Sequence, residues 1–324
     1  MNFLIPEISQ GDLVTFSEER VNLKKVDAQR YRDQVSNLRK DLERYIESHP
    51  EFGIEKMLLS GSLAKGTALK TIRDADVAVY VNGGSAPQEL AQLLTWLVEK
   101  LRLTYPQIDP SKIHVDGPCV VIAFSGTGIK VEIAPVYSLG DEAGRGYLWD
   151  RSTGKKILTS IPRHLEFIRK RKEKQPVHYA QIIRLMKWWI RQREKDTNGF
   201  KFRSFLVELI VAKVADSGAD FSDYHVGLEN VFSYIQNTGL KERIAFNDYY
   251  KATALPNVST GTVEIFDPVT PENNVAADLT ESNRVQLVTL SGAALDSLCY
   301  ARTCQTKNDA LDCWRELMGQ SFSA

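Results

Sequence analysis

The stretch that most limits how this chain can fold is residues 57–81, which read MLLSGSLAKGTALKTIRDADVAVYV. Its two apolar runs, MLL and VAVYV, favour short buried strands. A Gly-Ser pair follows the first run, and two aspartates open the second. Because successive side chains of a strand point to opposite faces, Asp74 and Asp76 share one face and the valines of the second run share the other. The segment therefore predicts a sheet with an apolar face and a pair of carboxylates at the start of one strand.

A third acid lies within a later apolar stretch, residues 130–136, which read KVEIAPV. The same alternation turns the apolar neighbours of Glu132 to one face and its carboxylate to the other. If this strand lies beside the one that Asp74 opens, Asp74, Asp76 and Glu132 converge at one edge of the sheet. Three close acids repel one another, and two divalent cations remove the conflict. We therefore expect the three to bind two Mg²⁺ ions, or Mn²⁺, which stabilise the attacking and leaving oxygens of a phosphoryl displacement.

The Gly-Ser pair offers a way to hold phosphate next to these acids. Gly61 allows close backbone approach and unusual dihedral angles, and a helix starting after it would aim N–H groups at an anion. Ser62 adds a hydroxyl donor. A lone Gly-Ser or Asp-x-Asp usually marks a plain turn or a solvated strand end, and the GSLAKG run lacks the Gly-Lys-Ser/Thr ending of a P-loop. The spaced combination is the specific signal, and it predicts that Gly61 and Ser62 bind a triphosphate that metal bridges to Asp74 and Asp76.

The pattern of the whole chain predicts an α+β protein in two parts. Apolar residues spaced by three or four over residues 17–47 predict one long amphipathic helix. Strand and helix patterns then follow up to about residue 160, and the rest of the chain is mostly helical. We expect a mixed sheet flanked by helices, including the long N-terminal helix, in residues 1–160. Residues 161–324 should form a helical domain.

Charge and cysteine usage exclude several other classes of protein. The 324 residues carry no formal net charge, which argues against constitutive binding to duplexes, so no obligatory nucleic-acid partner is expected. The four cysteines form no C-x-x-C pair and no metal spacing with the five histidines, as in reduced cytosolic proteins. The N-terminus lacks a signal-peptide pattern, and no window reaches the ~20 apolar residues of a membrane span. We expect a soluble, cytoplasmic protein without a membrane partner.

These features resemble the nucleotidyltransferase superfamily of DNA polymerase beta, which combines a Gly-Ser turn, an Asp-x-Asp strand start and a third acid on a later strand. Residues 184–194, RLMKWWIRQRE, resemble the superfamily's helix with a triphosphate-binding lysine, which implies this role for Lys187. Residues 203–213, RSFLVELIVAK, resemble the helix whose serine also contacts the triphosphate, here Ser204. The Asp-Pro and Asn-Asn-Val elements of residues 266–279 are similar to those of the bacterial cGAS/DncV-like enzymes, relatives of the oligoadenylate synthetases.

The resemblance implies a nucleotidyltransferase-like fold for residues 1–160, with the helical domain of residues 161–324 closing a nucleotide cleft. It also implies a metal-dependent cyclase of bacterial antiphage (CBASS) signalling. Such enzymes join nucleoside triphosphates, here with ATP as the expected substrate, into cyclic di- or trinucleotides and release pyrophosphate. Asp74, Asp76 and Glu132 would be both the catalytic and the metal-binding residues, although the family usually has aspartate in the third place. Some relatives are switched by another protein, so the resemblance also allows a regulatory protein partner.

Other interpretations stay open at the level of the sequence. A template-independent RNA-tailing enzyme or a linear oligoadenylate-type enzyme would share the catalytic half, and only the tailing enzyme needs a primer. Without the family, Lys187 reads as a surface lysine whose stem covers an apolar stripe, and Ser204 as a helix N-cap. Asp267 and Asn273 have turn-forming chemistry. The basic run at residues 163–174 is typical of a solvated helical face.

Overall fold

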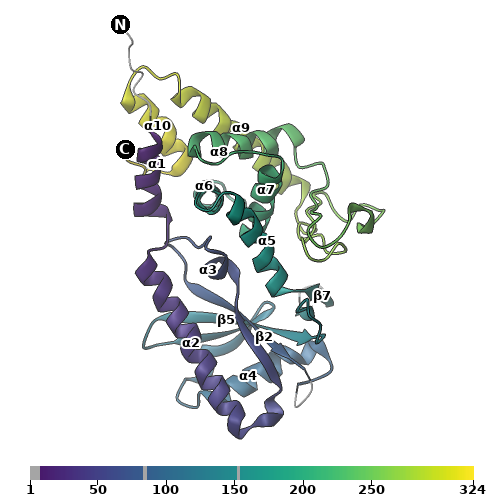
Figure 1. Cartoon of the computed structure of the whole chain (residues 1–324). Helices are drawn as coiled ribbons and strands as arrows, with labels where there is room; N and C mark the ends of the chain where they lie inside the picture. Colours follow the sequence, from purple (N-terminus) through teal and green to yellow (C-terminus); the bar gives the residue numbers. More distant parts are fainter. Residues whose placement is uncertain (1–7, 83–85, 152–153) are drawn as a thin grey trace. The chain divides into compact units, whose positions relative to one another are not determined.

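The computed structural model describes residues 8–82, 86–151 and 154–324. Contacts divide the chain into two compact units, whose elements are labelled in Figure 1. Leu23–Glu166 forms one, which we call the sheet unit. Phe167–Ala324 forms the other, the helical unit, together with the described segment before Leu23. The division falls within helix α5 (Ile161–Lys174), and the functional boundary expected at residue 160 stays a prediction.

The sheet unit is built on a mixed sheet with the strand order β1-β2-β5-β4-β3. Strand β2 runs parallel to β5, and the other neighbouring pairs are antiparallel. The end of β5 continues into a small antiparallel extension with β6 and β7. The described strands are β1 Ile54–Leu59, β2 Asp74–Val81, β3 Ile113–Asp116, β4 Cys119–Phe124, β5 Ile129–Ser138, β6 Gly146–Asp150 and β7 Lys155–Thr159. Strands β4 and β5 form an antiparallel hairpin.

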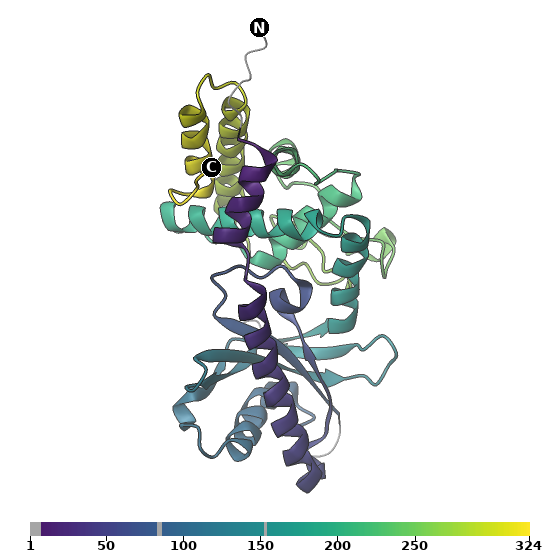
Figure 2. The same cartoon turned by 60° about the vertical axis from the view of Figure 1, so that its left-hand side comes forward.

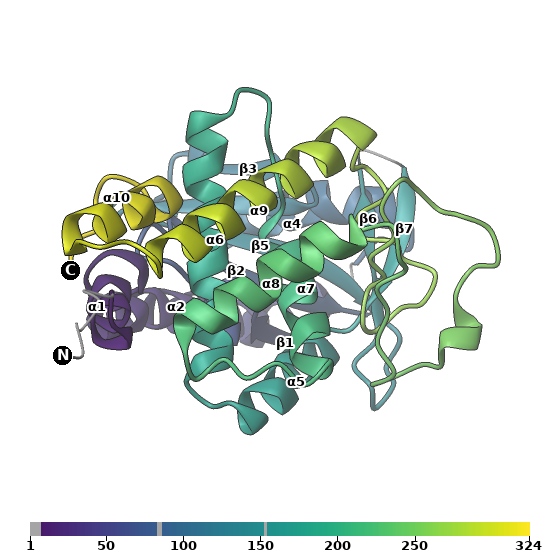
Figure 3. The same cartoon turned by 90° about the horizontal axis from the view of Figure 1, so that it is seen from above.

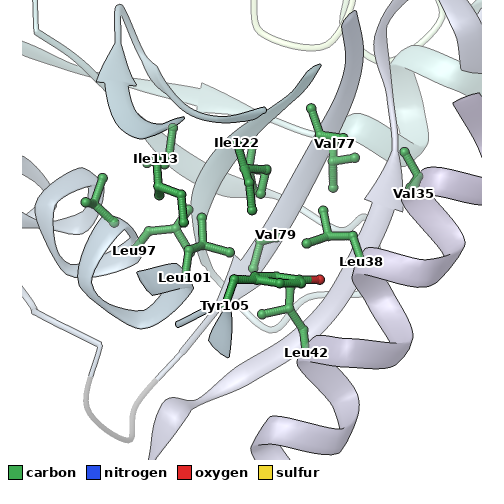
Figure 4. Close-up of a cluster of buried hydrophobic side chains, with 14 of the residues drawn as sticks. Val35, Leu38, Leu42, Val77, Val79, Leu97, Leu101, Tyr105, Ile113 and Ile122 are labelled. Carbon is green, nitrogen blue, oxygen red and sulfur yellow. The ribbon is translucent and has the colours of Figure 1, made fainter. Parts of the chain in front are cut away.

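Two helices, α2 (Lys25–Ser48) and α4 (Leu93–Thr104), contribute to the apolar core of the sheet unit. The long α2 runs along the sheet, as Figures 1 and 2 show. Leu38 from α2 and Leu101 from α4 lie near Val79 of β2 in Figure 4, and all three side chains are fully buried. Burial of each such side chain contributes about 1.5–3 kcal/mol to stability. This core uses one face of β2; the other face carries Asp74 and Asp76 at the start of the strand and buries Ala78 and Tyr80 further along it, in a smaller apolar cluster.

The predicted long N-terminal helix is confirmed as α2, but its expected start at residue 17 was wrong, because the helix is interrupted before Lys25. Helix α1 (Gln10–Phe16) and a π-helical turn end before Asn22, where the backbone is extended, and α2 begins three residues later. The amide group of Asn22 donates a hydrogen bond to Gln181 and accepts one from Arg184, both on α6 (His178–Asp196). These bonds hold Asn22 in the helical unit, and a continuous helical period cannot reveal such a long-range contact.

The other described helices of the helical unit are α7 Ser204–Asp216, α8 Tyr224–Thr238, α9 Glu281–Ala301 and α10 Lys307–Met318. Helix α8 packs against α9, and α9 against α10; α8 and α9 run side by side in Figure 3. Aromatic rings join the core of the unit: the ring centroids of Trp189 and Phe232 lie 4.8 Å apart. No helix in the described part of the chain is long and apolar enough to cross a membrane.

Candidate active site

The three predicted acids lie on two neighbouring strands of the sheet unit. The parallel register of β2 and β5 pairs Asp76 with Glu132 and Asp74 with Lys130. Neighbouring strands lie ~4.8 Å apart, so Asp76 and Glu132 lie side by side. Asp74, two residues before Asp76 on β2, lies on the same face of the sheet. All three acids are half-buried, whereas the valines on the opposite face of β2 are fully buried. The predicted adjacency of the two acid-bearing strands is therefore confirmed.

Burial and the neighbouring acids change the titration of Glu132. Burial, followed by the charges of Asp74 and Asp76, raises the pKa of Glu132 from 4.5 to about 7. Burial and then the charge of Glu132 raise the pKa of the Cys119 thiol to about 12, so this thiol stays protonated at neutral pH. The acids thus behave as one electrostatic cluster, which favours either a proton or a cation among them.

The Gly-Ser turn brings backbone directly against Asp76. Gly61 begins the short helix α3 (Gly61–Lys65) and has a φ of +60°, in the left-handed region that side chains disfavour. A Cβ added at Gly61 would lie 1.7 Å from Oδ2 of Asp76. The N–H of Ser60 donates a hydrogen bond of 2.8 Å to the carbonyl of Asp76, which ties the turn to β2. Ser62 follows on α3 and is half-buried, close in sequence to this contact.

The other two predicted phosphate ligands lie in the helical unit. Lys187 on α6 and Ser204, the first residue of α7, line one cavity of about 430 Å³. Ser204 is exposed, and Arg203 occupies the N-cap position before it. Lys187 is only 4% exposed, and its ammonium donates a hydrogen bond of 2.5 Å to Glu208 on α7. The interpretations of Lys187 as a surface lysine and of Ser204 as an N-cap were therefore wrong.

Comparisons with known proteins show which family this chain belongs to. The family model of the nucleotidyltransferase domain matches residues 35–126. The cyclic AMP-AMP-AMP synthase of Escherichia coli (strain MS 115-1) is 42% identical over 97% of this chain and 98% of its own length. The CBASS oligonucleotide cyclase CdnC of Escherichia coli (strain KTE188) is 31% identical over 90% of each chain. This chain belongs to the CBASS oligonucleotide cyclases.

Solved structures agree with this membership. The structure of E. coli MS115-1 CdnC with ATP matches this cyclase with a TM-score of 0.91 at 41% identity, over 97% of this chain and 99% of that one. Vibrio cholerae DncV with a nonhydrolysable GTP matches with a TM-score of 0.67 at 11% identity, over 98% of this chain and 97% of that one. This likeness shows a common fold. The predicted fold class and the predicted nucleotidyltransferase activity are confirmed.

Enzymes of this family generally depend on a divalent metal, and the acids of the cyclase have the chemistry to bind one. Mg²⁺ prefers carboxylate oxygens, and a cation would compensate the burial and the repulsion by Asp74 and Asp76 that together raise the pKa of Glu132. The carboxylates of Asp74, Asp76 and Glu132 do not, however, converge on one point. Across residues 8–82, 86–151 and 154–324, no three His, Cys, Asp or Glu side chains lie close enough together to hold a metal ion. A bound cation would have to draw Asp74, Asp76 and Glu132 together.

Two charged residues of the helical unit were missed by the sequence analysis. Glu208 contacts Lys187, and Arg191 lines the same cavity as Lys187 and Ser204. Residues four apart on a helix share a face, and this spacing separates Lys187 from Arg191 and Ser204 from Glu208. The helical pattern could therefore have suggested both residues, but only the packing of α6 against α7 brings the two faces together.

The turn-forming interpretation of Asp267 and Asn273 agrees with their contacts. The carboxylate of Asp267 accepts hydrogen bonds from the N–H of Val269 and, at 3.4 Å, from the side chain of Asn273. The N–H of Asp267 donates to the carbonyl of Asn273, which closes the loop. The neighbouring Asn274 is buried, and its side chain accepts from two backbone N–H groups. These residues shape the loop by pairing its backbone groups.

The basic run at residues 163–174 is only in part the solvated face that its composition predicts. Arg169 is exposed and pairs with Glu173, one turn further along α5. Arg171 is instead 6% exposed, and its guanidinium donates to the carboxylates of both Asp216 and Asp248. The prediction was wrong for Arg171, because acids distant in the sequence compensate its charge and allow its burial.

Proposed function

We propose that this cyclase joins ATP molecules into a cyclic triadenylate and releases pyrophosphate at each step. The observation that carries the proposal is the register of β2 and β5, which sets Asp76 beside Glu132 with Asp74 on the same face. The substrate and ring size rest on the 42% identical relative, which is a cyclic AMP-AMP-AMP synthase, and on the 41% identical CdnC, which was solved with ATP. The family allows other rings and linear products, and the experiment below separates them.

The acids set up the chemical step. Two Mg²⁺ ions, when held by Asp74, Asp76 and Glu132, would neutralise the phosphates and stabilise the attacking and leaving oxygens. The hydroxyl oxygen of one nucleotide forms a bond to the α-phosphorus of another, and the bond to the bridging oxygen of pyrophosphate breaks. In this proposal Glu132 would either help to hold the cation next to that hydroxyl or accept the proton of the hydroxyl. Positioning and charge compensation are sufficient for such a transfer.

The remaining site residues hold the donor triphosphate. Gly61 and Ser62 lie next to Asp76, where the phosphate chain must approach the acids. Lys187 and Ser204 line one cavity of the helical unit and supply an ammonium and a hydroxyl. Both groups donate hydrogen bonds, which phosphate oxygens accept. In this proposal the four residues bind the phosphates of a single donor nucleotide.

A regulatory protein also belongs to the proposed function. E. coli MS115-1 CdnC was solved in a complex named CdnC:HORMA-deltaN, and that chain matches this cyclase with a TM-score of 0.91 at 40% identity, over 98% and 99% of the two chains. We therefore propose a HORMA-domain protein as a partner of this cyclase, in the bacterial cytoplasm. Mixing the purified proteins and measuring product formation would test whether the partner changes the rate.

The proposed reaction is tested by incubating the purified cyclase with all four ribonucleoside triphosphates and Mg²⁺ or Mn²⁺, without primer. Mass spectrometry of phosphatase-resistant products should identify a cyclic triadenylate. The double variant Asp74→Asn and Asp76→Asn should form no product and retain the unfolding midpoint of the wild type. Linear products would support the oligoadenylate-type alternative, products only with an RNA primer would support tailing, and full activity of the double variant would refute the catalytic site.

A further inference from the structure

A buried ion pair joins α6 and α7 in the helical unit. The ammonium of Lys187 lies 2.5 Å from Oε1 of Glu208, and the two side chains are 4% and 3% exposed. Lysine and glutamate are almost never fully buried unless they are paired, because removing two charges from water is costly. Apolar side chains of similar volume often hold two helices together equally well or better. Helix packing alone therefore does not explain why this pair is charged.

The surroundings of the pair indicate what the charge is for. Lys187 lines the 430 Å³ cavity together with Ser204, whereas Glu208 is not part of the lining. Lys187 thus borders the cavity, and its ammonium contacts a carboxylate that lies outside the lining. The lining carries more cations than carboxylates: Lys187, Arg191, Lys201 and Arg203 against Glu194 and Asp278. An excess of positive charge and hydroxyl or ammonium donors suits an anion with several oxygens, such as a polyphosphate.

We propose that Glu208 is a positioning residue for Lys187 and that it fixes the lysine ammonium where the donor triphosphate binds. The inference rests on the proposed function, in which Lys187 and Ser204 hold that triphosphate. Ser204 and Glu208 are four residues apart on α7 and share a face of the helix. One helix therefore carries a phosphate ligand and, one turn later, the residue that positions the second ligand.

Glu208 contributes in two ways. Its negative charge compensates the buried ammonium, because a buried charge without a partner is costly in free energy. Its hydrogen bond also restricts the flexible side chain of Lys187, so less rotational freedom is lost when phosphate binds. An ammonium carries three N–H donors, so a bond to Glu208 is compatible with a contact to phosphate. Removing Glu208 should therefore weaken binding of the phosphate chain and leave binding of the nucleoside unaffected.

The experiment measures the affinity of the full chain for a nonhydrolysable ATP analogue and for AMP, by calorimetry with Mg²⁺ present. The variants are Glu208→Gln, Glu208→Asp, Lys187→Met and the double variant Lys187→Met with Glu208→Gln. Glu208→Asp keeps the charge and shortens the side chain by one methylene, so it carries the test if Glu208→Gln does not fold. Arg171→Met is the matched control, because Arg171 is also buried and paired in the helical unit.

Glu208→Gln should bind the ATP analogue roughly tenfold more weakly than the wild type, about the loss of one charge-assisted hydrogen bond, with AMP affinity unchanged. Glu208→Asp should show a smaller loss of the same kind. The double variant should bind no more weakly than Lys187→Met, because Glu208 acts through Lys187. Arg171→Met should unfold more easily yet keep the wild-type ratio of the two affinities.

An unchanged ratio in both Glu208 variants would overturn the inference, as would fully additive losses in the double variant. One result for Lys187→Met would instead refute the proposed role of Lys187 in binding the triphosphate. If Lys187→Met bound the ATP analogue as tightly as the wild type, Lys187 would not hold the triphosphate, and Glu208 would have no ligand to position. The two failures are thus separated by whether Lys187→Met changes the ratio of affinities.

Discussion

Replacing Gly61 by alanine tests the contact that sets the position of Asp76. The added Cβ would lie 1.7 Å from Oδ2, 2.3 Å from Cγ and 2.7 Å from Cβ of Asp76. Rotation of the carboxylate can relieve the first two clashes. It cannot relieve the third, because the Cβ of Asp76 is fixed to the backbone of β2. The variant must therefore shift either the turn or the strand.

The size of the effect follows from these distances. Ordinary contact begins at 3.4 Å, so the atoms of Asp76 must move by up to about 1.7 Å relative to the turn. A misplacement of about 1 Å in a catalytic group can cost roughly 100-fold in rate. The left-handed backbone of Gly61 adds a further cost of about 1–2 kcal/mol for any residue with a Cβ. We expect kcat to fall at least about 100-fold, with a modest loss of stability.

Gly117 provides the matched control. It lies between β3 and β4, has a φ of +55°, and a Cβ added there would meet nothing within 4 Å. Gly117→Ala therefore carries the same backbone cost as Gly61→Ala without displacing an acid. Pyrophosphate release and urea unfolding would be measured for both variants. Both should lose about 1–2 kcal/mol of stability, and only Gly61→Ala should lose activity.

Two outcomes would refute this reasoning. Gly61→Ala could retain more than a tenth of the wild-type rate, which would show that Asp76 tolerates the displacement. Alternatively, Gly117→Ala could lose as much activity as Gly61→Ala, which would make the loss a result of backbone strain in general. In either case the close approach of Gly61 to Asp76 would not be what the reaction requires.

Two further predictions concern pH. In the metal-free enzyme, burial and then the charges of Asp74 and Asp76 raise the pKa of Glu132 to about 7 in the folded chain against 4.5 when unfolded, so stability should fall as pH rises from 4.5 through 7. Glu132→Gln should show a shallower slope in urea unfolding, and Mg²⁺ should restore stability at pH 8 only in the wild type. Burial, and then the charge of Arg302, lowers the pKa of His225 from 6.5 to about 4. The unfolded chain therefore takes up this proton first, and up to about 3 kcal/mol should be lost as pH falls from 6.5 towards 4. An equally steep acid limb in His225→Phe would contradict this origin.

Sequence periodicity predicted that this part of the chain is helical, but it could not predict where the charged side chains of the helical unit lie. The helical periodicity of the apolar residues identified α6 and placed Lys187 at the border of its apolar stripe. At such a border the sequence pattern does not distinguish an exposed side chain from a buried one. Lys187 takes the buried position because the carboxylate of Glu208, on another helix, offsets the free-energy cost of burying its ammonium. Arg171 is buried for the same reason, through Asp216 and Asp248. Charged residues are the ones whose placement depends most on distant partners.

The sequence by itself determined the character of the catalytic sheet. Side-chain direction along a strand is a local property of the backbone, so alternation alone set Asp74, Asp76 and Glu132 opposite the apolar residues. Only the tertiary structure decided that β2 lies beside β5 in a register that pairs Asp76 with Glu132, and that Gly61 makes room for a carboxylate. These facts join segments far apart in the chain, and no local pattern carries information about which distant segment fills a given space.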